Sequence, residues 1–263
     1  MPGQARSDVI DGWNKLSAAY QSRYRIADDE ISYGPMIGGE ARFGLLGDLS
    51  GRTVLDVGCG GGQNSVALAR SGAKRVVALD PSAAQIAFAK GLAEDAGVKI
   101  DFREAGAEAL ARISGAFDVI VSFYALMYVV DLEGVFREIH RLLNPGGRFV
   151  ISADHPVRIA GQWQDDVFIL EDYNTPGWRS WIYDFPEQDV SAPMHRFHRR
   201  MQDWITPLLA ADLRLDGLLE PTPVDPPDTF GRVSRHGLDS PLNVFSPARL
   251  SRVPGSILLW GSK

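Results

Sequence analysis

A glycine-rich loop that directly follows an apolar strand constrains the fold of this chain more than any other feature. Residues 53–62 read Thr-Val-Leu-Asp-Val-Gly-Cys-Gly-Gly-Gly, and the apolar residues at the start are typical of a buried parallel strand. Because glycine has no Cβ, the loop can turn tightly and let a ligand approach the backbone. A helix predicted from Gln63 to Arg70 would point its N-terminal N–H groups at that ligand. Asp80 closes the next strand, where a carboxylate can accept hydrogen bonds from both hydroxyls of a ribose.

The loop also differs from the dinucleotide-binding fingerprint. That G-x-G-x-x-G pattern needs a third glycine where this chain has Gln63, so NAD is disfavoured as the ligand. The loop together with Asp80 resembles the first two motifs of the class I S-adenosylmethionine (SAM) methyltransferases. The resemblance continues through residues 117–122, which look like the family's fourth strand, and through residues 142–150, which look like the turn into its fifth. These motifs follow the family's order over residues 50–153.

Strands and helices alternate through this region. Strands are predicted near residues 53–58, 75–80, 98–103, 116–122 and 147–153, and helices near residues 63–71, 82–96 and 132–143. Such alternation implies right-handed crossovers and a parallel sheet with helices on both faces. Ligands of these sheets bind beyond the carboxyl ends of the strands. The crevice is therefore expected to be lined by residues 56–62, 80–85, 104–108, 122–128 and 153–156.

The rest of the chain fits the same family fold, a Rossmann-like, doubly wound α/β sheet of seven mostly parallel strands with an antiparallel C-terminal strand. The elements predicted downstream are a helix at residues 204–211, a strand near 213–220, a proline-rich connection beginning at Pro221 and a last strand at 257–260. We expect a single domain over residues 1–263. Its expected parts are an N-terminal lid (1–50), a SAM-binding core (51–153), a substrate cap (154–200) and a C-terminal helix and hairpin (201–263).

Composition narrows the class of partner. A chain of 263 residues with 45% hydrophobic content can bury one large core. With 27 basic and 33 acidic residues, the composition does not predict a basic surface that would bind nucleic acid or an anionic membrane. This favours a small-molecule partner. Cys59 is the sole cysteine, so neither a disulfide framework nor a zinc spacing is expected, and no metal is predicted. Without a signal-peptide pattern in residues 1–10 or an apolar run of about 18 residues, we expect a soluble, cytoplasmic protein of undetermined oligomeric state.

The N-terminal segment carries Trp13, Tyr20 and Tyr24 at helical spacing. In the family, such a segment often folds as a helical lid that keeps water from the reaction. On that interpretation Tyr20 and Tyr33 would contact the cofactor. The alternative is that the aromatic side chains only anchor a helix on the sheet.

Aromatic residues also dominate the segment between the predicted fifth strand and the next helix. Inserted there, they would lie above the mouth of the crevice, where loops on a rigid scaffold carry specificity. The candidates for contact with a flat or apolar substrate are Trp163, Tyr173, Trp178 and Trp181. The alternative is that these rings pack on one another to stabilise a long loop.

The family resemblance implies a set of cofactor contacts. Asp56 would orient the loop and the methionine ammonium, the backbone at Gly58 and Gly60 would contact the methionyl part, and Asp80 would hold the ribose. The remaining implied contacts are Asn64, Pro81, Gln85 and Ser122. Asn64 could instead cap the helix that begins there, and Cys59 is interpreted as a small filler rather than a nucleophile.

One family motif is altered. Many relatives have Gly-Asp-Ala near the third strand, with the Asp binding the adenine amino group. Residues 105–108 of this chain read Ala-Gly-Ala-Glu, so the backbone at Ala107 or the side chain of Glu108 would have to replace that contact.

Methyl transfer needs alignment of the acceptor and, for some acceptors, removal of a proton. His155 follows the fifth strand and has the pKa range of a general base, although it could only hydrogen-bond the loop or the substrate. Tyr124 is a second catalytic candidate, and both Tyr124 and Tyr128 could orient an acceptor. His195 and Arg196 belong to a basic cluster at 194–200 that could bind a carboxylate or phosphate on the substrate, or simply begin the next helix in solvent.

These observations predict a SAM-dependent methyltransferase resembling the small-molecule branch that includes the ubiquinone-biosynthesis type enzymes. The expected reaction yields S-adenosylhomocysteine and methylates an oxygen, nitrogen or carbon atom of a small molecule, for which a specialised metabolite is our hypothesis. The alternatives are a SAM-binding regulator that has lost catalysis and an NAD-linked oxidoreductase. An RNA methyltransferase is a weaker possibility.

Overall fold

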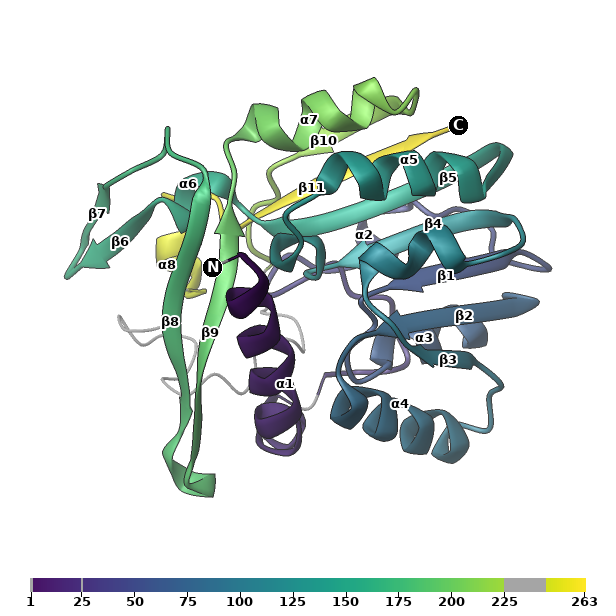
Figure 1. The fold of residues 1–263 in the computed structure, drawn as a ribbon, viewed down its shortest axis with the longest axis horizontal. Coiled ribbons are helices and arrows are strands. Elements are labelled where there is room, and N and C mark those ends of the chain that lie inside the picture. The colour runs from purple at the N-terminus through teal and green to yellow at the C-terminus, as the bar shows by residue number, and fades with distance from the viewer. Residues whose placement is uncertain (1, 25, 225–244) are drawn as a thin grey trace.

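A seven-stranded sheet forms the centre of the protein in a computed structural model that describes residues 2–24, 26–224 and 245–263 (Figure 1). The strand order is β10-β11-β5-β4-β1-β2-β3. The strands are β1 (Thr53–Val57), β2 (Arg75–Asp80), β3 (Asp101–Glu104), β4 (Phe117–Phe123), β5 (Leu143–Asp154), β10 (Arg214–Leu219) and β11 (Ser256–Ser262). Strand β11 is antiparallel to both of its neighbours, and the other pairs are parallel. The predicted fold class is thereby confirmed.

Helices cover both faces of this sheet. The main ones are α3 (Gln63–Arg70), α4 (Ala83–Asp95), α5 (Leu132–Leu142) and α7 (Met201–Ala210). Side chains of α5 and α7 share one apolar core with the sheet, in which Phe136 and Trp204 are buried. Helix α3 belongs to the core on the opposite face, through Ala67 and Leu68. In the sheet, β1 lies between β2 and β4, so the carboxyl ends of these strands meet at one edge.

The predicted elements differ from the observed ones mainly at their ends. Strand β5 begins at Leu143, four residues before the expected start, because it pairs with Phe117 of β4 before a register shift. Helix α7 begins at Met201 rather than at 204, since the Asp203 carboxylate accepts a hydrogen bond from the Arg200 N–H at 2.9 Å and so caps its first turn.

The N-terminal helix α1 (Pro2–Tyr24) lies across the carboxyl-end edge of the sheet, between the sheet and a long hairpin (Figure 1). It contacts α4 on one side and the hairpin on the other. At Gly12 an added Cβ would come within 2.5 Å of the Met194 sulfur, so glycine permits the close approach to the hairpin. Leu16 and Met194 are fully buried in this contact.

The segment between β5 and α7 forms two hairpins. Their strands are β6 (Gly161–Gln164) with β7 (Val167–Leu170) and β8 (Gly177–Phe185) with β9 (Val190–His198). The shorter elements of the chain are α2 (Glu40–Phe43), η1 (Ala107–Arg112), η2 (Leu126–Tyr128), α6 (Pro156–Ile159), η3 (Pro186–Gln188) and α8 (Pro247–Leu250). The aromatic-rich segment is thus mainly β structure rather than a long loop, and its β8–β9 hairpin rests against α1.

No helix among the described residues combines the length and the apolar character needed to cross a membrane. Likewise, none of the described His, Cys, Asp and Glu side chains form a group of three that could hold a metal ion.

Candidate functional site

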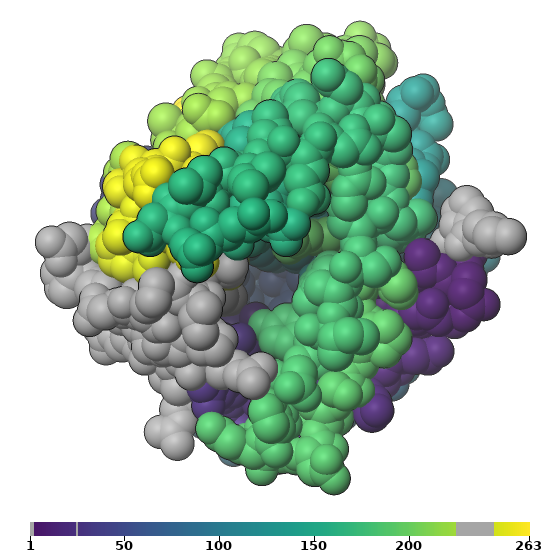
Figure 2. Space-filling view, turned by 90° about the vertical axis from the view of Figure 1, so that its left-hand side faces the viewer, coloured from purple at the N-terminus to yellow at the C-terminus, as the bar shows by residue number. Residues whose placement is uncertain are grey.

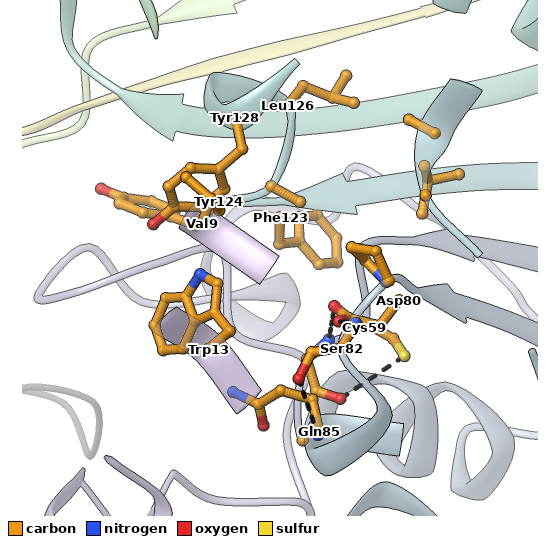
Figure 3. Close-up of a pocket in the computed structure, with 18 of the residues that line it drawn as sticks. Val9, Trp13, Cys59, Asp80, Ser82, Gln85, Phe123, Tyr124, Leu126 and Tyr128 are labelled. Carbon is orange, nitrogen blue, oxygen red and sulfur yellow. Dashed lines mark hydrogen bonds between the residues drawn. The ribbon is translucent and has the colours of Figure 1, made fainter. Parts of the chain in front are cut away.

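A pocket opens at the carboxyl ends of the central strands, beneath α1 (Figure 3). Its walls come from the glycine loop after β1, the residues that follow β2, β3 and β4, and the inner side of α1. Of the predicted site residues, those that line it are Tyr20, Gly58, Gly60, Asn64, Asp80, Pro81, Gln85, Ala107, Glu108, Tyr124 and Tyr128. The strand topology and helix α1 together therefore bring to one pocket residues spread over more than 100 positions.

The glycine loop owes its shape to backbone conformations that favour glycine. Gly58 has φ +84°, and its N–H donates to the Leu79 carbonyl at 2.7 Å. A Cβ there would lie 2.1 Å from the Ala125 Cβ, so the loop can pass close to the segment after β4 only without a side chain. Gly60 has φ +53°, and no atom lies within 4 Å of where its Cβ would be. The loop is consequently open toward the pocket at Gly60.

Asp80 joins the glycine loop to the start of α4. Its Oδ2 accepts a hydrogen bond from the Gly60 N–H at 2.9 Å, and its Oδ1 accepts one from the Ser82 N–H at 2.9 Å. Burial raises the pKa of Asp80 to about 6, although these two backbone donors lower it. Within the described part of the chain, no cationic side chain forms an ion pair with it. A partly buried carboxylate with spare acceptor sites and no cation suits a ligand that presents hydroxyl groups.

Asp56 and Ser122, two of the predicted cofactor contacts, lie beneath the pocket rather than in its wall. The Ser65 hydroxyl donates to Asp56 at 2.6 Å, and the Ser122 hydroxyl donates to the Val57 carbonyl at 2.7 Å. Burial raises the pKa of Asp56 to about 7, while the hydrogen bond from Ser65 lowers it and the charge of Asp80 raises it. Both side chains hold the end of β1 and its neighbours in place from below.

Polar side chains of α1 hold this helix against the N-terminal end of α4. The Gln21 amide donates to the Gln85 side chain at 3.0 Å and accepts from the Gln63 amide, and the Ser17 hydroxyl donates to Gln85 at 3.2 Å. Asn14 accepts from the Ser82 hydroxyl at 2.8 Å. Since Gln63 begins α3 and Gln85 lies in α4, the network fixes α1 to both helices that flank the glycine loop.

Aromatic rings form the opposite wall. Trp13 of α1 lies 5.0 Å from the Tyr20 ring and 6.4 Å from the Tyr128 ring, measured between centroids, and both contacts are edge-on; Figure 3 labels Trp13 and Tyr128. Burial raises the pKa of Tyr128 to about 12 and that of Tyr20 further. Trp13 was not among the predicted contacts. Its spacing of seven residues from Tyr20 places both on one helix face and was the signal that could have found it.

Ala107 and Glu108 follow β3, at the position where many members of the family have their adenine contact. Ala107 and Glu108 both line the pocket. The Glu108 carboxylate forms an ion pair with Arg6 of α1 in which both side chains remain about half exposed. This pair links α1 to the third strand's loop, so Glu108 has a partner from the helix itself.

Asn64 and Tyr33 tie the segment after α1 to the site. The Asn64 side chain accepts from the Ser32 N–H at 2.8 Å and donates to the Ser32 carbonyl at 2.9 Å, while Gly62 caps α3 without a side-chain bond. Tyr33 is fully buried and outside the pocket, with its hydroxyl bonded to Glu40. Its ring lies 5.1 Å from that of Phe123, which does line the pocket. Tyr33 therefore supports a wall residue from behind.

The two catalytic candidates lie in different surroundings. Tyr124 lines the pocket with φ +55°, a conformation that is costly for a non-glycine residue, and its hydroxyl bonds to Ser256. His155 lies outside the pocket. Its Nδ1 accepts from the Val157 N–H at 3.1 Å, which leaves the proton on Nε2 for the Glu220 carboxylate at 2.6 Å. Burial lowers the pKa of His155, while Glu220 raises it.

The aromatic residues of the insertion that were predicted to bind substrate lie outside the pocket. Trp163 packs on Phe168 and beneath the guanidinium of Arg249, and the Tyr173 hydroxyl accepts from the Met201 N–H at 2.9 Å. Trp178 packs edge-on against Phe197 at 5.4 Å. Trp181 belongs to the apolar cluster that α1 shares with β8 and β9. Contact of any of these rings with a substrate stays a prediction.

The basic cluster at 194–200 is largely buried instead of beginning a helix in solvent. His195 of β9 is bonded to the Ser180 hydroxyl at 2.7 Å and lies 3.5 Å from the Asp8 carboxylate. Arg196 forms an ion pair with Asp154 at 3.0 Å. Arg199 donates to backbone carbonyls after β4, among them that of Val130 at 2.9 Å.

Comparison with known proteins gives the same assignment for the core. Residues 55–151 match the family described as "Methyltransferase domain". The ubiquinone biosynthesis O-methyltransferase of Pseudomonas paraeruginosa is 43% identical over 105 residues, which is 40% of this chain and 45% of that protein. The chain thus matches less than half of the length of this curated relative.

Solved structures extend the similarity of fold to most of the chain. An S-adenosylmethionine-dependent methyltransferase from Mesorhizobium loti superposes with a TM-score of 0.65 at 24% identity, over 84% of this chain and 94% of that one. The [4+2]-cyclase SpnF superposes with a TM-score of 0.63 at 18% identity, over 98% of this chain and 97% of that one. At these identities the likeness shows the fold, which proteins of different activity share.

The glycine loop, Asp80 and the sequence match over residues 55–151 agree with one another. Residues 55–151 therefore match a methyltransferase domain, within a fold that the chain shares with an S-adenosylmethionine-dependent methyltransferase.

Proposed function

We propose that this protein transfers a methyl group from SAM to an oxygen, nitrogen or carbon atom of a small molecule. The observation that carries the proposal is a single pocket with a polar half at Gly60 and Asp80 and an aromatic half at Trp13 and Tyr128, closed over by α1. In this proposal residues 51–153 bind the cofactor, residues 1–50 form the lid and residues 154–200 form the cap, all within one domain.

The residues of the polar half fit the cofactor. The Asp80 carboxylate would accept the two ribose hydroxyls with the acceptor sites that Gly60 and Ser82 leave unused. The open face of Gly60 would give the methionyl part an approach to the backbone, and Ala107, which lines the pocket, would lie beside the adenine. When bound, SAM supplies a methyl group that its positively charged sulfur activates.

The aromatic half would hold the acceptor. Trp13, Tyr128 and Phe123 present flat surfaces to the pocket, and the Tyr128 hydroxyl, whose pKa is raised to about 12, stays protonated and can donate to an acceptor. Tyr124 would orient the acceptor from the end of β4. These rings exclude water, which favours transfer by alignment of the reacting atoms.

The surroundings of His155 favour a supporting role over that of a base. A base needs a free nitrogen within reach of the proton that it removes. In His155 one nitrogen accepts from Val157 and the other faces Glu220, and the side chain lies outside the pocket. This arrangement supports an acceptor that proximity alone activates, for which an amine is the simplest example.

This proposal does not take the identity of the methyl acceptor from the ubiquinone biosynthesis relatives. The family match spans residues 55–151, whereas α1 and the insertion, which cover the aromatic half, lie outside it. A substrate of specialised metabolism in the cytoplasm remains our hypothesis.

Calorimetric titration with SAM, S-adenosylhomocysteine and NAD in parallel tests the cofactor. Binding of the first two alone is expected, and binding of NAD alone would refute the proposal. Release of S-adenosylhomocysteine is then measured over a panel of amines, phenols and carbon acids, with Asp80→Ala as the inactive control. SAM binding without turnover of any acceptor would favour a regulator that has lost catalysis.

A further inference from the structure

A buried cluster of three charged side chains lies where β5 ends. Asp154 closes β5, Arg158 lies in α6, and Arg196 lies on β9. One carboxylate oxygen of Asp154 pairs with Arg158 and the other with Arg196, the latter at 3.0 Å. The side chains of Asp154 and Arg158 are 3% and 9% exposed, and that of Arg196 is 23% exposed.

The charges of this cluster do not balance. Two guanidinium groups face one carboxylate, which leaves a net charge of one positive unit among largely buried groups. Burial lowers the pKa of Arg158 to about 9 and that of Arg196 to about 10, so both remain protonated at neutral pH but lose solvation. The Arg196 Nε is buried and has no hydrogen-bond partner among the described residues. A buried donor and an unpaired positive charge both cost free energy unless a ligand meets them.

The cluster adjoins the aromatic half of the pocket. Strand β9 contacts η2, which carries Tyr128. The Arg196 guanidinium lies 4.8 Å from the centre of the Trp181 ring, which packs in the same apolar group as Tyr128. The charge of Arg196 also acts on the Tyr128 hydroxyl.

The two hairpins next to this cluster border a hollow on the surface. Figure 2 shows this depression between the β6–β7 hairpin above and the β8–β9 hairpin below. Arg158 lies in the helix directly before β6, and Arg196 lies on β9.

Building on the proposed function, we propose that Arg158 and Arg196 bind a carboxylate of the methyl acceptor, so that the substrates are aromatic or otherwise flat acids. A single negative charge would neutralise the cluster. A carboxylate also matches the planar fork of a guanidinium. The rings of Trp13 and Tyr128 would then hold the body of the same molecule.

Matched pairs of acids and neutral amides test this proposal. The full-length protein, saturated with S-adenosylhomocysteine, is titrated with benzoate, phenylacetate and indole-3-acetate, and with the primary amide of each. We expect at least one acid to bind about tenfold or more tightly than its amide, since a charge-assisted pair is lost with the charge. Phenyl phosphate, a dianion, is a further arm, and its tighter binding would assign the site to phosphate and overturn the carboxylate proposal.

Variants at Arg196 link the preference to the cluster. Arg196→Met should reduce the difference between acid and amide to less than about threefold, whereas Arg196→Lys should retain part of it because the charge remains. Arg214→Met is the matched control, since that side chain is 74% exposed on β10 and should leave the preference intact. Circular dichroism and the melting temperature report whether each variant is folded.

Equal binding of acids and amides, or no binding of any acid to protein that holds S-adenosylhomocysteine, would overturn the anion site. The same titrations without S-adenosylhomocysteine separate this outcome from failure of the proposed function. A protein that prefers acids but binds neither SAM nor its product would keep the anion site and lose the methyltransferase assignment.

Discussion

The two halves of the pocket present different chemical groups to a ligand. In the polar half the contacts are backbone groups and one carboxylate, held by hydrogen bonds of 2.9 Å between Asp80, Gly60 and Ser82. In the aromatic half they are side chains, and each ring is positioned by another ring, as Trp13 is by Tyr20. The first half rests on the central strands, and the second rests on α1 and the segment after β4.

This difference predicts how each half responds to substitution. Few atoms define the polar half, so removal of Asp80 withdraws several hydrogen bonds together. Several rings share the aromatic half, so loss of one removes only part of its surface. Cofactor binding should therefore depend sharply on one residue, whereas acceptor choice should vary gradually across the rings.

The largest effect is expected for Asp80→Ala. Each hydrogen bond to a charged group contributes about 1.5–3 kcal/mol, so loss of two to the ribose should weaken SAM binding by about 100-fold or more. Calorimetry measures the change. Asp101→Ala is the control, because Asp101 begins the adjacent strand, pairs with Arg75 and Arg103 and lies outside the pocket. Unchanged SAM affinity in Asp80→Ala would contradict the ribose role.

The next effect is a tenfold change in SAM affinity per pH unit as the same carboxylate, Asp80, titrates. Burial raises the pKa of Asp80 to about 6, and its ionised form is the one that accepts two hydroxyl hydrogen bonds. Protons therefore compete with SAM below that pKa, so affinity should be level above about pH 7 and fall about tenfold per unit below about pH 6. Titrations from pH 5 to 8 measure this dependence. The isosteric Asp80→Asn variant should bind weakly at every pH, and an equally steep dependence in that variant would assign the titration to another group.

A smaller effect is expected where α1 meets both halves. Gln21→Leu would leave the Gln63 amide without its partner and would leave Gln85 with only the hydrogen bond from Ser17. Each buried group left unpaired costs about 1–3 kcal/mol. Part of this cost should favour a state in which α1 is detached from α3 and α4. SAM should then bind about five- to tenfold more weakly and dissociate faster. Stopped-flow fluorescence measures the dissociation rate, and Lys15→Ala on the exposed side of α1 serves as the control. Wild-type rates in Gln21→Leu would favour a helix that only packs on the sheet edge.

The sheet could be predicted from the sequence because its signals are local. Buried parallel strands read as short apolar runs, and the positive φ values at Gly58 and Gly60 occur where the chain has glycine. The handedness of the crossovers then places the ends of β1, β2 and β4 at one edge. Those rules suffice to bring Asp80 beside the glycine loop.

The hairpins of the insertion could not be predicted in the same way. Their turns use Asp165 and Asp189 at φ +51° and +50°, without the Asn-Gly or Asp-Gly pairs that mark hairpins in a sequence. Aromatic residues there are compatible with packing and with binding, and the sequence does not distinguish the two. The partners Asp154 and Arg196 are 42 residues apart, a separation that no spacing rule covers.

The smallest effect is expected for His155→Asn, and it tests whether the acceptor side needs a base. Loss of a general base typically lowers turnover by about 100-fold or more. His155 instead caps α6 through Val157 and faces Glu220, and asparagine can still accept from that N–H. We therefore expect turnover within about threefold of the wild-type value with unchanged SAM affinity, once an acceptor is in hand. Glu220→Gln is the matched variant and should behave alike. A 100-fold loss of turnover in His155→Asn, with SAM binding and melting temperature intact, would return the proton transfer to this histidine and require the Glu220 contact to open during the reaction.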